Sequence, residues 1–173
     1  MNKIVITGMG AVTPIGIGVA EYWNGLVSGV HGIGKITRFD ASTLPVQIAA
    51  EVKGFDATEH MPRKLAREMD LFMQYGYVAA EEAMQDADLH PDAPEARTVP
   101  AERIGIVVGT AFAGIATIAE TQNSISTGAQ SKVSPRFVPK VIGNIAAAQI
   151  AIAKQRQRIC RLISLFIFFT EFF

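Results

Sequence analysis

The sequence has little of the chemistry that small metal-binding or disulfide-linked proteins need. Its 173 residues include one cysteine, Cys160, and three well-separated histidines. One cysteine excludes an internal disulfide and leaves too few thiolates for a structural zinc site. His31, His60 and His90 have no partner one helical turn away, whereas ligand histidines come in sets. We therefore predict no metal site and no cofactor, and the cytoplasm as the compartment.

Charge imbalance and long apolar runs are also missing. The 16 basic and 16 acidic residues cancel, and no basic stripe indicates a nucleic-acid partner. The longest charge-free apolar stretch, Val141 to Ala153, has 13 residues, whereas a membrane span needs about 20. The N-terminus turns to glycine and threonine after a short apolar run, so we read no signal peptide. Membrane insertion is therefore not expected.

Apolar periodicity predicts an alternation of strands and helices. The predicted strands are Lys3–Thr7 (KIVIT), Val46–Val52 and Ile104–Val108 (IGIVV), and the predicted helices are Gly18–Ser28, Glu68–Ala87 and the apolar end of Ser134–Lys154. In the helix over 68–87, methionines, alanines and a phenylalanine recur every three or four residues, which predicts a core-facing stripe. From Val141 onward the last helix is apolar on every face, so we expect it in a core.

Two segments invite a functional interpretation. Gly8 to Gly16 (GMGAVTPIG) follows a predicted strand, but Thr13 stands where a dinucleotide loop has its third glycine, and Pro14 follows. A structural turn into the first helix explains it better. Between Arg103 and Lys132 there is a single charge, Glu120. We expect that charge-poor segment to be buried or to lie in an interface.

Four blocks, in order, resemble the β-ketoacyl-acyl carrier protein synthases. They are VITGMGAVTPIG, RKLAREMDLFMQYGYVAAEEAMQDADL, ERIGIVVGTAFAGIATIAE and SKVSPRFVPKVIGNIAAAQIAI. The likeness runs from about Lys3 to about Gln155. We therefore predict a partial N-terminal synthase domain over residues 1–155 and an apolar tail outside the family over 156–173.

The resemblance implies an α/β chain with a thiolase-like fold, of which this sequence holds an incomplete first half, a mixed sheet with covering helices. It implies acyltransferase chemistry in fatty-acid elongation, the decarboxylative condensation of acyl and malonyl groups carried by acyl carrier protein. It also implies a homodimer. Polyketide ketosynthases share the pattern and stay open as an alternative. Carried over residue by residue, Phe112, Phe137 and Ile142 line the acyl pocket; packing in a core or dimer contact is the other interpretation of each.

No catalytic residue carries over. After Gln155 the family continues to a cysteine in a Thr-Ala-Cys-Ser-Ser turn, where this sequence has LISLFIFF. Cys160 stands too early and lacks that turn, and the family's two catalytic histidines belong to the second half. We interpret the sequence as a truncated or frameshifted condensing enzyme that is inactive alone. A non-catalytic dimerisation or interaction module and a membrane-attached fragment are the other hypotheses.

Overall fold

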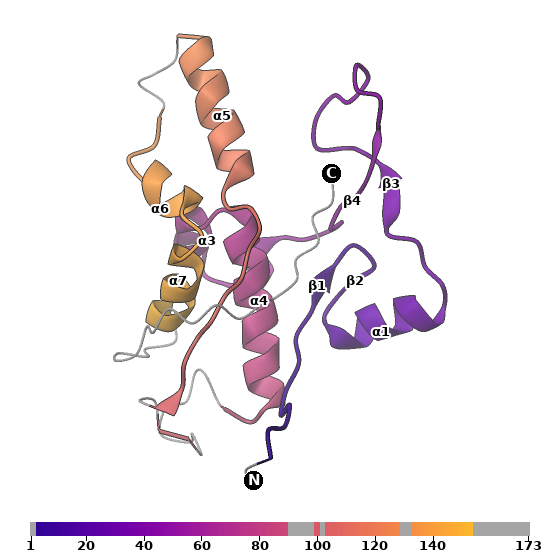
Figure 1. Cartoon of the computed structure of the whole chain (residues 1–173), viewed down its shortest axis with the longest axis vertical. Helices are drawn as coiled ribbons and strands as arrows, with labels where there is room; N and C mark the ends of the chain where they lie inside the picture. The colour runs from indigo at the N-terminus through magenta and orange to yellow at the C-terminus, as the bar shows by residue number, and fades with distance from the viewer. Residues whose placement is uncertain (1–2, 90–98, 101–102, 129–132, 154–173) are drawn as a thin grey trace.

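The computed structural model describes residues 3–89, 99–100, 103–128 and 133–153 (Figure 1). Its first part holds two small antiparallel sheets. They pair β1 (Val12–Thr13) with β2 (Gly16–Ile17) and β3 (Ile33–Lys35) with β4 (Ile48–Ala50). Helix α1 (Val19–Val27) confirms the helix predicted over 18–28. The strand predicted over 46–52 is present but shorter, because three residues of β4 pair with β3.

Six further helices follow. They are α2 (Ala57–His60), α3 (Arg63–Glu68), α4 (Leu71–Asp86), α5 (Ile115–Ser126), α6 (Phe137–Val141) and α7 (Ile145–Ala153). Figure 1 shows α4 in the middle of the molecule, with α1 and both sheets on one side and α6 and α7 on the other. Helix α5 extends away from this body. The long helix α4 is therefore the element on which the rest is assembled.

The periodicity predicted a helix that begins at Glu68, but α4 begins at Leu71. Met69 and Asp70 have extended backbone, which separates α3 from α4. The Asp70 side chain accepts a hydrogen bond from the Phe72 amide at 3.4 Å and so caps the first turn of α4. An aspartate at this position satisfies a helix-end N–H that has no partner in the helix. The cap at Asp70 thus sets the start of α4, which apolar spacing alone placed too early.

The core forms where the apolar stripe of α4 meets α7. Met69 and Met73 are 2% and 1% exposed, and Ala146 and Ile150 of α7 belong to the same buried cluster. Met69, Met73 and Met84 are all buried, which confirms the predicted stripe. Unbranched methionine side chains fill the irregular space between helices of different direction.

The last predicted helix is two helices and is not buried all round. Backbone at Ile142 is extended and separates α6 from α7. Ile152 on α7 is 73% exposed, because α7 packs with the side that carries Ala146 and Ile150. Within the described ranges, no helix has the length and apolar character needed to cross a bilayer.

Two predicted strands are wrong as strands in this structure. Lys3–Thr7 and Ile104–Val108 belong to no helix and to no sheet. No backbone hydrogen bond joins either segment to another described residue. A strand exists only when a second strand accepts and donates its hydrogen bonds. The apolar character of both segments was read correctly, but the described residues provide no partner for them.

Candidate functional site

The predicted acyl-pocket residues lie on two segments that touch. Phe112 belongs to the turn from Thr110 to Gly114, whereas Phe137 and Ile142 lie at the start and just past the end of α6. A Cβ on Gly114 would stand 2.6 Å from Val141 Cα, and one on Gly143 would stand 3.0 Å from Thr110 Cγ2. Side chains at either glycine would therefore force these two segments apart.

Gly114 also has a conformation that suits glycine. Its φ is +61°, in the left-handed region, where it serves as the N-cap of α5. The Thr110 hydroxyl donates a hydrogen bond to the Phe112 carbonyl and closes the turn. Phe112 is nevertheless 67% exposed, and Ile142 is 41% exposed. The structure thus brings the two segments together but leaves Phe112 and Ile142 open to solvent, and pocket lining stays a prediction for all three residues.

Asp70 fixes the start of α5 against α4. Its side chain is 6% exposed and accepts hydrogen bonds from the Thr117 amide, at 3.2 Å, and from the Thr117 hydroxyl. One buried carboxylate thus caps α4 and holds the first turn of α5. Sequence reasoning noted the Met-Asp pair only as part of a family block. Its position directly before the helix is the signal that indicates a cap.

In the glycine segment that resembles a phosphate loop, backbone amides donate hydrogen bonds to carboxylates of α4. Glu82 on α4 accepts hydrogen bonds from the amides of Ala11 and Val19, at 2.9 and 2.7 Å. Asp86 accepts one from the Met9 amide at 2.9 Å. The amides that a phosphate would need are already bound to carboxylates.

The glycines themselves have a packing role. A Cβ on Gly10 would lie 1.9 Å from the Ala79 carbonyl oxygen, and one on Gly8 would lie 2.2 Å from the Ala83 carbonyl oxygen. Both values are far below contact distance, so this segment lies against α4 because it lacks side chains. The geometry supports the structural-turn interpretation of this segment.

Of the remaining candidates, His31 and His60 lie within the described residues, and neither belongs to a metal-binding cluster there. His60 stacks on Phe55, with ring centroids 5.7 Å apart, and His31 is exposed. His90 and Cys160 lie outside the described residues. Across the described ranges, no three His, Cys, Asp or Glu side chains stand close enough to hold a metal ion.

An open depression of about 540 Å³ lies beside α3, and sequence reasoning missed it. Phe55, Met69 and Leu71 give it apolar lining, and Arg63, Arg67 and Lys140 add three cations. Charges from α3 and α6 come together here, which no short sequence window reveals.

The acidic side chain that lines the depression with them is already engaged. Asp56 accepts hydrogen bonds from the Thr58 hydroxyl and amide, which lower the pKa of its carboxyl below the ordinary value. It stays ionised as the cap of α2. With three cations against one acid, the depression is suited to an anionic partner.

Comparison with known proteins identifies the family. The family model for the N-terminal domain of beta-ketoacyl synthases matches residues 1–156. The 3-oxoacyl-[acyl-carrier-protein] synthase 2 of Synechocystis is 39% identical over 151 residues, and that of Staphylococcus aureus strain COL is 40% identical over 151. Each match covers 87% of this chain and 35% of the relative. The chain thus spans about a third of the length of these curated relatives.

Solved ketosynthases have the same fold. The ishigamide ketosynthase/chain length factor matches with a TM-score of 0.71 and 28% identity, over 87% of this chain and 36% of that one. A beta-ketoacyl synthase from Burkholderia phymatum matches with a TM-score of 0.70 and 24% identity, over 89% and 37%. The AntDE ketosynthase, solved with its type II polyketide acyl-carrier protein, matches with a TM-score of 0.67 and 23% identity, over 88% and 40%. These neighbours confirm the thiolase-like fold, and the family model shows that the chain belongs to the beta-ketoacyl synthases.

Proposed function

We propose that this chain supplies the N-terminal part of a 3-oxoacyl-[acyl-carrier-protein] synthase, which condenses acyl and malonyl groups in fatty-acid elongation. The observation that carries the proposal is the identity of 39–40% to two such synthases over 87% of the chain. This function implies the cytoplasm as the compartment of the protein. A polyketide ketosynthase is the alternative, which the polyketide neighbour supports at the level of fold.

A chimera tests this function. Residues 1–155 replace the corresponding segment of the Staphylococcus aureus synthase, and condensation is measured with acyl and malonyl groups on acyl carrier protein. We expect a folded chimera to elongate the acyl group, with the parent synthase as the control. A folded chimera that carries out no condensation with any acyl length contradicts the proposal. A chimera that accepts only polyketide-type substrates favours the alternative.

We predict that the 173-residue chain by itself forms no acyl-enzyme. A nucleophilic cysteine needs an oriented base and an oxyanion hole, and the sequence around Cys160 has no turn of the type that presents one. Intact mass is measured after incubation of the chain with acyl-acyl carrier protein, and no stable adduct is expected. An adduct on Cys160 that forms with the folded chain and not with the urea-unfolded chain contradicts this prediction.

We further propose that the basic depression beside α3 binds the carrier protein. Its lining combines the cations of Arg63, Arg67 and Lys140 with apolar and polar side chains. Lys64 is exposed next to Arg63, and Arg136 extends the positive charge, although it lies 3.7 Å from Glu68. Charges arranged in this way accelerate association with an acidic surface and orient it.

Charge reversal tests the carrier-protein surface. In the active chimera, we expect Arg63→Glu with Arg67→Glu to weaken binding of acyl carrier protein about tenfold or more, with a loss of salt dependence. Lys35→Glu with Lys53→Glu is the matched control, because it also reverses two exposed cations, both outside α3. Equal weakening by the control and the α3 variant indicates a general charge effect and contradicts the assignment.

A non-catalytic interaction module is the second candidate. Helix α5 has no buried residue among its twelve. Ile115, Ile118 and Ile125 lie on one face of it, and the last two are each 45% exposed. An isolated helix of this length is marginal in water, so such a face favours a partner helix, including that of a second copy in a homodimer. Size-exclusion chromatography discriminates, because a defined dimer that Ile118→Glu abolishes favours this function.

A further inference from the structure

The start of α5 is capped by a side chain from another part of the sequence. Its own N-cap is Gly114, which has no side chain to accept the free amides of the first turn. A larger residue does not fit there, because a Cβ would stand 2.6 Å from Val141 Cα. Asp70 accepts a hydrogen bond from the Thr117 amide at 3.2 Å instead, and Thr117 is the third residue of α5. This is the amide that an N-cap side chain ordinarily binds.

The same carboxylate caps α4, so its two oxygens hold the starts of two helices together. Oδ1 accepts from the Phe72 amide at 3.4 Å, and Oδ2 accepts from the amide and the hydroxyl of Thr117. Asp70 is 6% exposed, and all these groups belong to the described residues. The contacts therefore do not arise from surface that a longer protein would cover. Loss of a donor would leave a buried oxygen unsatisfied, which favours this one arrangement.

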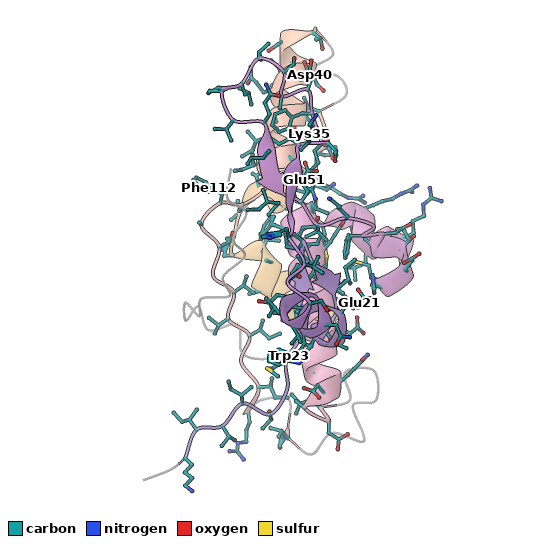
Figure 2. All side chains as sticks on the ribbon, turned by 90° about the vertical axis from the view of Figure 1, so that its right-hand side faces the viewer. Glu21, Trp23, Lys35, Asp40, Glu51 and Phe112 are labelled. Carbon is teal, nitrogen blue, oxygen red and sulfur yellow. The ribbon has the colours of Figure 1, made fainter. Side chains whose placement is uncertain are left out.

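The turn that carries Phe112 leads directly into the capped helix. Figure 2 shows Phe112 at the edge of the molecule, where its side chain is 67% exposed. Its position is therefore set by the backbone of the turn and not by packing of the ring. The Thr110 hydroxyl closes the turn on the Phe112 carbonyl, and Gly114 lies against α6. Asp70 links the same segment to α4 through Thr117.

We propose that Asp70 is a positioning residue for acyl-chain selection, which acts through Thr117 on the placement of Phe112. The inference rests on the proposed function, in which Phe112 is predicted to line the acyl pocket. A hydrophobic pocket discriminates between chains by about tenfold or more per methylene group. That discrimination requires lining residues whose supports hold them in one position. A turn released from α4 can shift, and the pocket then accepts longer chains.

The test uses the chimera that carries residues 1–155 within the Staphylococcus aureus synthase, with acyl groups of increasing length on acyl carrier protein. Selectivity is the ratio of kcat/KM for the preferred acyl group to kcat/KM for the group two carbons longer. We expect Asp70→Asn to lower this ratio about fivefold or more. Asparagine caps α4 as well as aspartate does, but it has a single accepting oxygen, so the bond to α5 is lost. With the preferred group, kcat should stay within about threefold, because chemistry is unchanged.

Substitutions at Thr117 test the route through which Asp70 acts. Thr117→Val removes the hydroxyl and should lower the selectivity, whereas Thr117→Ser keeps the hydroxyl and should hold selectivity within about twofold of the parent chimera. Asp70→Asn combined with Thr117→Val should lower the ratio by no more than about twofold beyond Asp70→Asn alone, because residues in one hydrogen-bonded group do not contribute additively. Circular dichroism first shows that each variant is folded, and if Asp70→Asn is not, the Thr117 pair decides.

Two controls separate positioning from a general loss of stability. Thr121→Val changes α5 one turn later, and Glu82→Ala removes a carboxylate toward the other end of α4. Both should keep the parent selectivity. Unchanged selectivity in folded Asp70→Asn and Thr117→Val overturns the inference, as do controls that lower selectivity equally or a Thr117→Ser variant that fails to retain it. In each of these results the chimera still condenses, so the proposed function stands. A folded chimera that condenses no acyl group contradicts the proposed function, and the inference falls with it.

Discussion

At the scale of single residues, two carboxylates on α4 explain how the glycine segment is held. Glu82 joins the amides of Ala11 and Val19, which lie on either side of the β1–β2 hairpin. Val19 is the first residue of α1, so the same carboxylate also lies at a helix N-terminus, where negative charge is favoured. From the sequence, Glu82 was one of several acidic residues on an amphipathic helix. Its role depends on contacts with two residues that lie 71 and 63 positions earlier in the sequence.

Replacing Glu82 by alanine should destabilise the fold. The change leaves two part-buried amides without their acceptor, and we expect a loss of about 1–3 kcal/mol in the free energy of unfolding. The measurement is a urea titration followed by circular dichroism, with Glu120→Ala on the exposed surface of α5 as the control. A Glu82→Ala protein as stable as the control would show that water replaces the carboxylate without cost.

Glu51 makes the β3–β4 hairpin sensitive to acid. The Thr37 hydroxyl donates to it at 2.7 Å, and the amides of Thr37 and Arg38 also donate to it. The Thr37 hydroxyl, with these amides, lowers the pKa of the Glu51 carboxyl below its ordinary value. A lowered folded-state pKa adds stability above the unfolded-state pKa, which is lost as the pH falls through the folded-state value.

The expected result is faster amide exchange in β3 and β4 as the pH falls below about 4, the ordinary range of a glutamate, after correction for intrinsic exchange rates. Nuclear magnetic resonance of the Ile36 amide, which directly follows β3 and donates to the Gln47 carbonyl at 3.0 Å, measures it. Glu51→Gln should remove most of this pH dependence. An unchanged profile in that variant would assign the effect to another carboxyl.

At the scale of elements, the start of α5 is held by side-chain hydrogen bonds to α4 as well as by its contact with α6. The helix has no buried residue, and its first turn is tied to α4 by Asp70 and Thr117. Thr117→Val keeps the side-chain shape but removes the hydroxyl. We expect amide exchange in α5 to rise by the equivalent of about 1.5–3 kcal/mol, the usual range for a hydrogen bond to a charged group. Thr121→Val on the same helix is the control, and equal effects would contradict the role of Asp70.

Elements that depend on local signals were predictable, and those that need a distant partner were not. The spacing of apolar residues located α1 and α4, because a helix satisfies its own backbone. KIVIT and IGIVV have strong strand composition, yet a strand requires a neighbour that composition does not supply. The split between α6 and α7 was missed although Gly143 and Asn144, which form the turn between them, are residues typical of turns. For the candidate site, Phe112, Phe137 and Ile142 came from family resemblance, whereas the basic depression required the fold.

At the scale of the whole molecule, the described part of the chain leaves apolar surface uncovered. Besides Ile4 and Ile6, the exposed large side chains include Trp23, Val27 and Ile152. The relatives have about two-thirds of their length outside the matched region. Burial of apolar surface contributes roughly 25 cal/mol per Å², so 400 Å² left uncovered forgoes on the order of 10 kcal/mol. Whole-domain stability is itself about 5–15 kcal/mol.

We therefore expect the 173-residue chain, expressed alone, to be marginally stable or to aggregate. The measurement is a urea melt at micromolar concentration, followed by circular dichroism and light scattering. A broad or irreversible transition with a free energy of unfolding below about 5 kcal/mol is the expected outcome. The chimera that carries residues 1–155 within a full-length synthase is the control and should unfold at higher urea, because the rest of that protein covers the same surface. A reversible, cooperative transition of the isolated chain above about 5 kcal/mol would show instead that the short helices and the α4–α7 core suffice for an independent domain.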